Sequence, residues 1–226
     1  YIKGEFRRQH SLCSFCNLCT LMVVLAIGAH PDDIEYGCGG SLLKHKFLHN
    51  HKVYLLVITR GEMSGGAEVR TKEQEEAARF LKADGLFWGG FKDTEIPDGK
   101  PLIEKIDEII SKVKPDLIYV NYPDDAHQDH RAVANATIAA CRYSKRVLFY
   151  EDYTTRNFEP NVFVDIADVL DKKIELLKIH RSQVEKPYPT GLDMLESVHS
   201  IASFRGFQGK VKYAEGFVAL RYLLPI

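Results

Sequence analysis

Short apolar runs alternate with helical patterns along most of this chain, and this alternation limits its fold more than any other feature. The runs at 23–29 and 53–59 are rich in β-branched residues and apolar on both faces, as buried parallel strands are. Between them, residues 37–50 gather their large apolar side chains on one helical face. Strands that alternate with helices form βαβ units, so we predict an α/β fold with a mostly parallel sheet and helices on both faces. Further strands are predicted at 117–120, 147–150 and 162–166, and further helices at 71–82, 102–113, 131–142, 167–180 and 192–204.

The length, charge and cysteine content narrow the class of protein. The chain has 226 residues, 45% of them hydrophobic and 27% charged, which suits one globular domain with a sizeable core. A formal net charge of −1 gives no electrostatic reason to expect a nucleic acid or an acidic membrane as partner. No apolar run reaches the roughly 18–20 residues that span a bilayer, so we predict no transmembrane segment. The five cysteines are an odd number with three clustered, which favours a reducing, cytoplasmic setting over a disulfide framework.

Residues 1–21 are interpreted as an N-terminal extension of uncertain origin before a single domain at 22–226. Two arginines precede the apolar run 18–29, and together they have the look of a signal peptide. We reject that interpretation because cleavage after the run would remove the strand that presents His30. Met22 lies directly before the strand and is the natural start that we expect.

The extension also holds four side chains of metal-ligand type. His10, Cys13, Cys16 and Cys19 follow one another at a three-residue spacing. Structural zinc sites more often use two separated pairs of ligands, and the sequence offers no second pair. We therefore favour incidental cysteines, with a metal site as the alternative.

Two clusters of ligand-type side chains follow two of the predicted strands. Residues 30–33, His-Pro-Asp-Asp, come directly after the first strand, and residues 127–130, His-Gln-Asp-His, follow the strand at 117–120. In parallel α/β sheets, ligands bind beyond the carboxyl ends of the strands. We therefore expect both clusters to meet at one edge of the sheet and to assemble one metal site.

The side chains of the first cluster divide by role. A turn that contains Pro31 can point His30 and Asp33 toward a common centre, and imidazole nitrogen and carboxylate oxygen are both good Zn²⁺ ligands. His130 is the best candidate for the third ligand, and three protein ligands with one open position are typical of catalytic zinc. Asp32 then remains as a base that takes a proton from water activated by the metal. The alternative is a simple turn whose aspartate caps the following helix, which the second cluster makes less favourable.

Other residues near the two clusters keep open roles. Asp129 could cap the helix that follows it, or accept a hydrogen bond from a histidine ring. His127 could stabilise a developing oxyanion or protonate a leaving amine. The glycine-rich segment 37–40 faintly resembles a phosphate-binding loop, and it is the only basis for a non-catalytic ligand-binding module. We favour glycines that let the helix pack close to the sheet.

Together, these residues resemble the LmbE-like, or PIG-L-type, zinc-dependent N-acetylglucosaminyl deacetylases. The signature of that family, Ala-His-Pro-Asp-Asp-x-Glu before a glycine-rich helix start, reads here as residues 29–35. The resemblance runs from Met22 to about Leu220. Further matches, in order, are Thr59-Arg60-Gly61-Glu62, Arg70 with Glu73 and Ala77, Pro123, residues 127–130, His180 with Ser182 and Gln183, and residues 213–217.

The resemblance implies a Rossmann-like fold, one zinc ion per chain, and removal of the N-acetyl group from an N-acetylglucosamine-containing substrate with release of acetate. It also implies a homo-oligomer, either a trimer or a hexamer. An amide hydrolase of a thiol–sugar conjugate or an antibiotic precursor is the alternative with the same site chemistry. By matching position, the implied residues are the zinc ligands His30, Asp33 and His130, the general base Asp32, the transition-state histidine His127 with its supporting Asp129, and the sugar-contacting Arg60.

Overall fold

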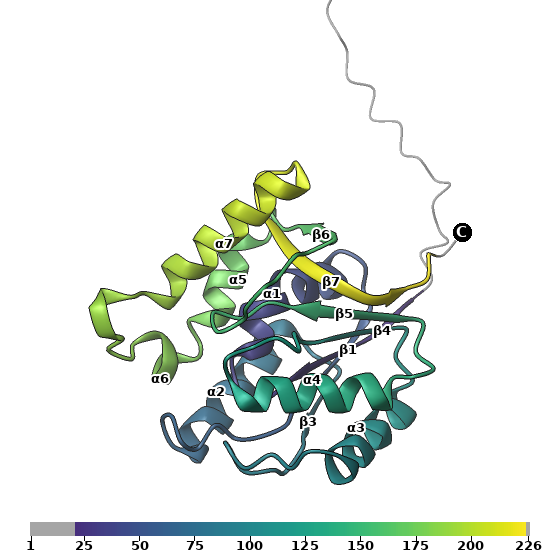
Figure 1. The fold of residues 1–226 in the computed structure, drawn as a ribbon. Helices are drawn as coiled ribbons and strands as arrows, with labels where there is room; N and C mark the ends of the chain where they lie inside the picture. Colours follow the sequence, from purple (N-terminus) through teal and green to yellow (C-terminus); the bar gives the residue numbers. More distant parts are fainter. Residues whose placement is uncertain (1–20, 225–226) are drawn as a thin grey trace, which may run out of the picture.

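The computed structural model describes residues 21–224, which form an open seven-stranded sheet with helices on both faces (Figure 1). The strand order is β3-β2-β1-β4-β5-β7-β6. Strands β1 to β5 are parallel, whereas β7 is antiparallel to both of its neighbours, β5 and β6. The predicted α/β fold with a mostly parallel sheet is confirmed. The strands are β1 (Val23–Gly28), β2 (Lys52–Val57), β3 (Gly85–Trp88), β4 (Leu117–Asn121), β5 (Arg146–Tyr150), β6 (Val162–Asp165) and β7 (Ala214–Tyr222).

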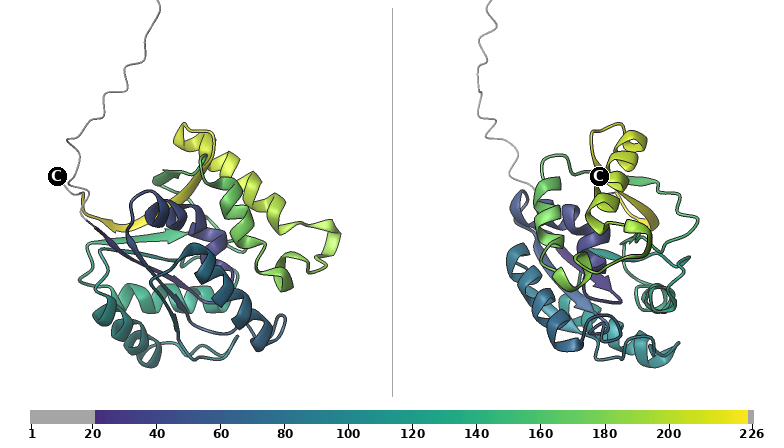
Figure 2. Two further views of the ribbon diagram at one scale, coloured as in Figure 1. Left: turned by 180° about the vertical axis from the view of Figure 1, so that it is seen from behind. Right: turned by 90° about the vertical axis from the view of Figure 1, so that its left-hand side faces the viewer.

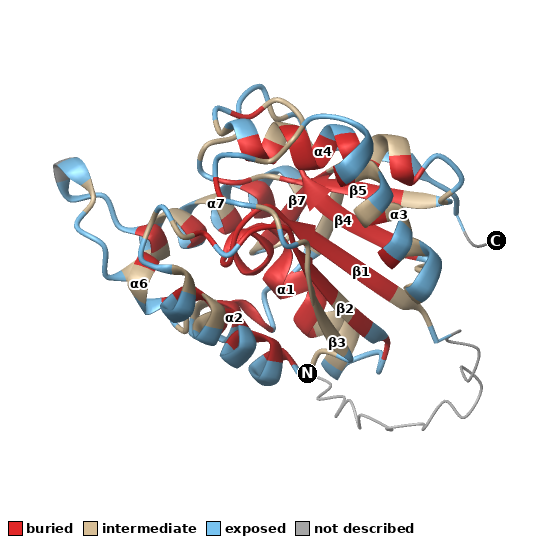
Figure 3. Ribbon diagram, turned by 90° about the horizontal axis from the view of Figure 1, so that it is seen from below, coloured by how far each residue is buried: buried red, intermediate tan, exposed pale blue. Residues whose placement is uncertain are grey.

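The helices divide between the two faces of the sheet, as two views of the ribbon show (Figure 2). They are α1 (Asp33–Phe47), α2 (Ala67–Leu81), α3 (Lys100–Val113), α4 (Gln128–Ala140), α5 (Leu170–Leu177), α6 (Arg181–Val184) and α7 (Met194–Gly209), with a 3₁₀ turn η1 (Pro189–Gly191). In β1, Val24 and Ala26 pack into a core cluster with side chains of α1, α2 and α5. The alternate residues Leu25 and Ile27 pack into a second cluster with side chains of α3 and α4. The central strands are therefore buried on both faces (Figure 3), which explains their continuous apolar runs.

Helix α1 begins at Asp33, four residues earlier than the predicted start at Gly37. The missed turn, residues 33–36, contains no glycine and belongs to the motif that the sequence analysis places in a turn. The glycines that follow let α1 pack close to the sheet: a Cβ at position 37 would overlap the ring of Tyr150, and one at Gly40 would lie 2.9 Å from Ile166. Asp33 lies in the first turn of a helix rather than in an extended loop.

The sequence pattern misses two strands, β3 and β7. β3 is an edge strand of only four half-buried residues, and its apolar run Leu86–Trp88 is too short to distinguish a strand from the end of the preceding helix. β7 is buried at its start and exposed at its end, and Gly216 interrupts its pattern. The predicted helix at 167–180 is also shorter in the structure, because α5 ends at Leu177 and the separate short helix α6 follows.

Two expectations from the sequence concern membranes and the N-terminus. None of the helices within residues 21–224 has both the length and the apolar character needed to cross a bilayer. The extension with Cys13, Cys16 and Cys19 lies outside the described residues, apart from Leu21.

Candidate active site

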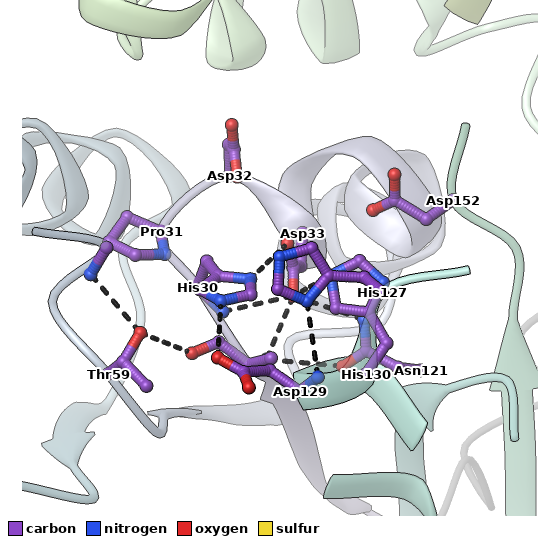
Figure 4. A network of polar contacts seen from close by, with 12 residues as sticks. His30, Pro31, Asp32, Asp33, Thr59, Asn121, His127, Asp129, His130 and Asp152 are labelled. Carbon is purple, nitrogen blue, oxygen red and sulfur yellow. Dashed lines mark hydrogen bonds and ion pairs between the residues drawn. The ribbon is translucent and has the colours of Figure 1, made fainter. Parts of the chain in front are cut away.

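The two predicted ligand clusters meet at the carboxyl edge of the sheet. Strands β1 and β4 are parallel neighbours, so the segments that follow them, 30–33 and 127–130, emerge side by side. Figure 4 shows His30, Asp33, His127 and His130 gathered together, whereas Asp32 points away from them. A pocket of about 200 Å³ lies over this group. Its lining consists of His30, Asp32, Asp33, Ser64, Arg70, Asp93, His127, His130, Tyr153, Thr154, Gln183 and Lys186.

Asp33 is held in place by hydrogen bonds to one of its oxygens. Its Oδ2 accepts the backbone N–H of Ala29 at 2.9 Å and of His30 at 3.0 Å, and Nδ2 of Asn121 at 3.1 Å. Burial raises the pKa of Asp33, but the imidazoles of His130 and His30 outweigh it and hold that pKa well below its usual range. Asp33 is therefore an ionised carboxylate, and its other oxygen, Oδ1, lies 3.7 Å from Nδ1 of His30.

One ring nitrogen of His130 contacts the carboxylate of Asp125, and the other faces Asp33. Nδ1 lies 3.2 Å from Oδ2 of Asp125, and Nε2 lies 3.4 Å from Oδ2 of Asp33. Asp125 is fully buried, and its second oxygen accepts the backbone N–H of His127 at 2.7 Å. Burial lowers the pKa of His130, but the carboxylates of Asp33 and Asp125 raise it to about 10. The hydrogen-bond network assigns the Nδ1 proton to the Asp125 contact, which leaves Nε2 as the ligand atom.

In His30 the two ring nitrogens have the opposite roles: Nε2 contacts the supporting carboxylates and Nδ1 faces Asp33. Nε2 lies 3.1 Å from both Oδ2 of Asp129 and Oδ1 of Asp93, and Nδ1 lies 3.7 Å from Oδ1 of Asp33. Burial lowers the pKa of His30, but these three carboxylates raise it well above its usual value. Nε2 carries the ring proton and donates it in hydrogen bonds to Asp129 and Asp93. Nδ1 is therefore the unprotonated nitrogen, and it faces Asp33.

Of the two roles left open for Asp129, the hydrogen bond to a histidine ring is the one present. Its side chain accepts from His30 and, at 2.8 Å, from the backbone N–H of Thr94. The N-cap of α4 is His127, whose Nδ1 accepts the backbone N–H of Asp129 at 3.2 Å. An imidazole that accepts at Nδ1 carries its proton on Nε2, so neutral His127 is a donor rather than a metal ligand. Burial, with His30 and His130 nearby, lowers the pKa of His127 and favours this neutral form.

The geometry offers more than one combination of metal ligands. Among residues 21–224, three groups bring one ligand atom per residue within 4.8 Å of one another: His30 with His127 and His130, His30 with Asp93 and Asp129, and Asp33 with His130 and Asp152. The predicted set of His30, Asp33 and His130 is divided between the first and the third group. In the second group, the Nε2–H of His30 donates to Asp93 and Asp129, so these atoms form hydrogen bonds. In the first group, His127 carries its proton on the nitrogen that would have to bind the metal. The tautomers therefore favour Nδ1 of His30, Asp33 and Nε2 of His130, a nitrogen and oxygen set that fits a divalent metal.

Asp32 has an unusual backbone and its own cationic partner. Its φ of 96° is in the left-handed region, which costs a non-glycine residue about 1–3 kcal/mol, and its side chain makes no cap hydrogen bond to α1. Oδ1 lies 3.2 Å from Nη2 of buried Arg70, which also donates to the carbonyl groups of Pro31 and Gly61. Burial raises the pKa of Asp32 although Arg70 opposes the shift.

A buried polar chain supports the backbone of Asp32 from behind. Oε1 of Gln74 accepts the Asp32 N–H at 3.4 Å, and Nε2 of Gln74 donates to Oε1 of Glu35 at 2.7 Å. Nε2 of fully buried His180 lies 3.4 Å from the other Glu35 oxygen. Glu35, the last residue of the signature motif, therefore supports the loop and does not line the pocket.

Arg60 does not line the pocket either. Its Nη1 donates to Oγ1 of Thr71 at 2.7 Å, and its guanidinium lies over the ring of Trp88 at 4.6 Å. The contact with sugar expected for Arg60 therefore stays a prediction. Sequence reasoning gave no site role to Arg70, Asp93, Asp125 or Asp152, although Asp152 follows a predicted strand at the same sheet edge.

The comparisons with known proteins agree with this arrangement. A sequence model described as GlcNAc-PI de-N-acetylase, PIG-L, matches residues 25–141. The chain belongs to the PIG-L family. The matched segment includes both ligand clusters and the strands that carry them, so the family predicted from the sequence is confirmed.

Relatives of this PIG-L protein are named deacetylases. An Escherichia coli protein described as the uncharacterized deacetylase YaiS is 35% identical over 170 residues, which is 70% of this chain and 90% of that protein. The diacetylchitobiose deacetylase of Thermococcus kodakarensis is 29% identical over 85% of this chain and 81% of its own. The solved N,N'-diacetylchitobiose deacetylase of Pyrococcus horikoshii superposes with a TM-score of 0.77 and 28% identity, covering 87% of this chain and 83% of that one.

Proposed function

We propose that this member of the PIG-L family is a zinc-dependent N-deacetylase that removes the acetyl group from an N-acetylglucosamine-containing substrate and releases acetate. One observation carries the proposal: His30 and His130 each give one ring nitrogen to a buried carboxylate and turn the other toward Asp33. Such paired orientation is typical of metal ligands and their supporting residues. His30, Asp33 and His130 would hold the ion.

The metal suits the electrostatics of the group. Asp33, Asp125 and Asp129 crowd two imidazoles, and the raised pKa values of His30 and His130 mean that these rings hold protons when no other cation balances the carboxylates. A divalent cation would replace those protons. Bound there, Zn²⁺ would supply Lewis-acid polarisation of an amide carbonyl and of water.

Asp32 is the general base in this proposal. Its side chain points away from the ligand cluster and lines the pocket, so it can take a proton from an attacking water without binding the ion. Its raised pKa brings a carboxylate closer to the range in which proton transfer at neutral pH is efficient. Arg70 at 3.2 Å fixes the orientation of the carboxylate.

His127 is the hydrogen-bond donor to the substrate oxygen in this proposal. As a neutral imidazole with its proton on Nε2, it donates a hydrogen bond to the oxyanion that develops on the amide carbonyl. Because Asp129 bonds to His30 with its side chain and to His127 with its backbone N–H, one residue sets the orientation of both rings.

The test joins metal analysis with acetate release from a panel of N-acetylated sugars. The purified protein should hold one zinc per chain and release acetate from N-acetylglucosamine or its conjugates. Asp32→Asn should keep the metal and lose at least about 100-fold in kcat, because it removes a general base. Full activity in metal-stripped protein, or an active Asp32→Asn variant, would refute the assignment.

The oligomeric state and the cellular location of the enzyme also remain predictions. A trimeric or hexameric assembly would be measured by light scattering, and a cytoplasmic location by cell fractionation. The substrate is a small amino-sugar molecule, and the thiol–sugar and antibiotic-precursor alternatives are separated by including such conjugates in the acetate-release panel.

A further inference from the structure

Three histidines lie together at the amino edge of the sheet, at the opposite end of the strands from the candidate active site. His45 is in the last turn of α1, and His49 and His51 belong to the segment that leads into β2. The ring centroids of His45 and His51 are 5.1 Å apart, and the ring of His49 stacks on that of His51 at 5.3 Å. We name these three residues the histidine cluster.

The backbone between α1 and β2 sets the positions of the two inner rings. The N–H of His51 donates to the carbonyl of His45 at 2.9 Å. Asn50 has a φ of 53°, in the left-handed region that asparagine adopts more readily than most residues. This turn folds the chain back onto the end of α1, so the side chains of His45 and His51 meet.

Two ring nitrogens of the histidine cluster are as close as neighbouring ligands of a metal ion. Nδ1 of His45 lies 2.9 Å from Nδ1 of His51. Imidazole nitrogens bind Zn²⁺ at about 2.0–2.1 Å, and at that bond length two nitrogens with this separation subtend about 90° at an ion equidistant from both. A right angle is typical of the tetragonal sites of Cu²⁺ and Ni²⁺, whereas a tetrahedral zinc site needs nitrogens about 3.3 Å apart.

Without a metal, the same contact is a hydrogen bond. Burial and the neighbouring histidines lower the pKa of both His45 and His51, so at neutral pH each ring is neutral and carries one proton. One Nδ1 then donates to the other. A metal ion can replace this hydrogen bond when the proton on the donating Nδ1 moves to Nε2 of the same ring, and binding then releases no proton.

The two Nε2 atoms have different surroundings. Nε2 of His45 lies 3.0 Å from the hydroxyl of Tyr119, which is buried in β4 and can orient the ring as the supporting residue of a metal ligand does. Nε2 of His51 is buried and has no hydrogen-bond partner within residues 21–224. The pair therefore leaves His51 only half satisfied, and an unsatisfied buried nitrogen points to a group that the protein itself does not supply.

We propose that the histidine cluster binds one Cu²⁺ or Ni²⁺ ion through Nδ1 of His45, Nδ1 of His51 and the ring of His49. His49 is exposed, so its side chain can change rotamer within nanoseconds and reach the ion without a change in the backbone. The ion would join the end of α1 to the start of β2. Asp33 and His45 are about 18 Å apart along α1, so this site is separate from the active site and does not rest on the proposed function.

The experiment adds Ni²⁺ to protein that has been loaded with one zinc per chain and measures bound nickel by equilibrium dialysis. Ni²⁺ is the probe because, unlike Cu²⁺, it is not reduced by the thiols of the chain. We expect one Ni²⁺ per chain that His51→Gln abolishes. His49→Gln should weaken its binding at least about tenfold, since even the loss of a residue that supports a ligand costs that much.

Two further variants keep the result interpretable. His49→Gln changes an exposed side chain, so it tests the site even if His51→Gln impairs folding. The matched control is His199→Gln, because His199 is also exposed but lies on α7, outside the histidine cluster. The control should bind Ni²⁺ as tightly as the wild type. Acetate release should be unchanged in His49→Gln, so the proposed function is tested separately.

Three outcomes would overturn the inference. The first is that the zinc-loaded protein binds no Ni²⁺. The second is a bound Ni²⁺ that remains in both His51→Gln and His49→Gln, which would place it on other groups, such as the thiols of Cys13, Cys16 and Cys19 outside the described residues. The third is an equal loss in His199→Gln, which would indicate binding by exposed imidazoles in general. The comparison between variants is valid whether or not the active site holds zinc.

Discussion

Replacing Asp125 by asparagine tests the interpretation of His130 as a metal ligand. In the structure, Oδ2 of Asp125 accepts the Nδ1 proton of His130 at 3.2 Å, and Thr154 and Thr155 hold the carboxylate through hydroxyl contacts of 2.6 and 2.8 Å. Asparagine has nearly the same size and can keep its amide oxygen toward the ring, but its amide nitrogen then replaces Oδ1, which accepts the backbone N–H of His127. The variant therefore removes the charge together with the acceptor for the His127 N–H, and thermal unfolding of the metal-free protein measures the second loss.

The expected loss of zinc affinity follows from the contact between Asp125 and His130. A hydrogen bond to a charged group contributes about 1.5–3 kcal/mol, and one between neutral groups about 0.5–1.5 kcal/mol. The substitution should therefore lower the free energy of zinc binding through His130 by about 1–1.5 kcal/mol. That free energy corresponds to a zinc Kd about tenfold weaker, within the roughly 10- to 100-fold range for residues that support metal ligands. Acetate release should recover largely when zinc is raised to saturation.

The assay is a competition titration of zinc against a chromophoric chelator, with thermal unfolding of the metal-free protein as a check on folding. Asp124→Asn is the matched control, because Asp124 is the neighbouring aspartate and pairs only with Arg156 and Asn157 in contacts of 2.8 Å among the described residues. Its zinc Kd should stay within about twofold of the wild type, as expected for a surface ion pair. An unchanged Kd for Asp125→Asn, or an equal loss for Asp124→Asn, would refute the role of Asp125 and with it the assigned tautomer of His130.

Two further predictions concern the fold around the site. Gly37→Ala should lower the free energy of unfolding in urea by about 1–3 kcal/mol, because its Cβ would overlap the ring of Tyr150; Gly39→Ala is its control, since the nearest atom there is 3.4 Å away and alanine should be neutral or stabilising. Equal effects of the two substitutions would contradict the close packing of α1 on β5. Burial, together with the neighbouring histidines His51 and His49, lowers the pKa of His45 to about 3 in the folded protein, so the unfolded chain takes up a proton below about pH 6.5 that the folded chain does not. The free energy of unfolding should therefore fall between about pH 6.5 and pH 3, by at most about 1.4 kcal/mol per pH unit from this group, and His45→Gln should flatten that slope; an unchanged slope would contradict the half-buried neutral ring.

The parts of the fold that the sequence predicts are those with an unambiguous local pattern. β1 is predicted because its alternate residues enter two different core clusters, which makes the run apolar at every position. The apolar runs of β3 and β7 are short, because β3 is a four-residue edge strand and β7 becomes exposed along its length. Their place in the sheet is decided by pairing with distant strands, which no local pattern contains.

The same limit explains which site residues were missed. Asp93 follows β3, and a sequence reading that omits this strand has no reason to bring Asp93 to the carboxyl edge beside His30. Asp152 follows β5, which the sequence does predict, so the rule that ligands bind beyond the carboxyl ends of strands could have found it. The contact between Arg70 and Asp32 joins residues 38 positions apart and depends on how α2 packs, which cannot be known before the tertiary structure is.

The start of α1 explains why two adjacent aspartates can have different roles. Asp33 is the first helical residue, and its side chain turns back to accept the N–H groups of Ala29 and His30. Asp32 precedes the helix with a φ of 96°, and this reversal directs its carboxylate to Arg70 and away from the ligand cluster. If α1 began at Gly37, nothing would fix the two carboxylates in opposite directions. The division into a ligand and a base is thus a property of the backbone at one helix start, which Gln74 and Glu35 support from behind.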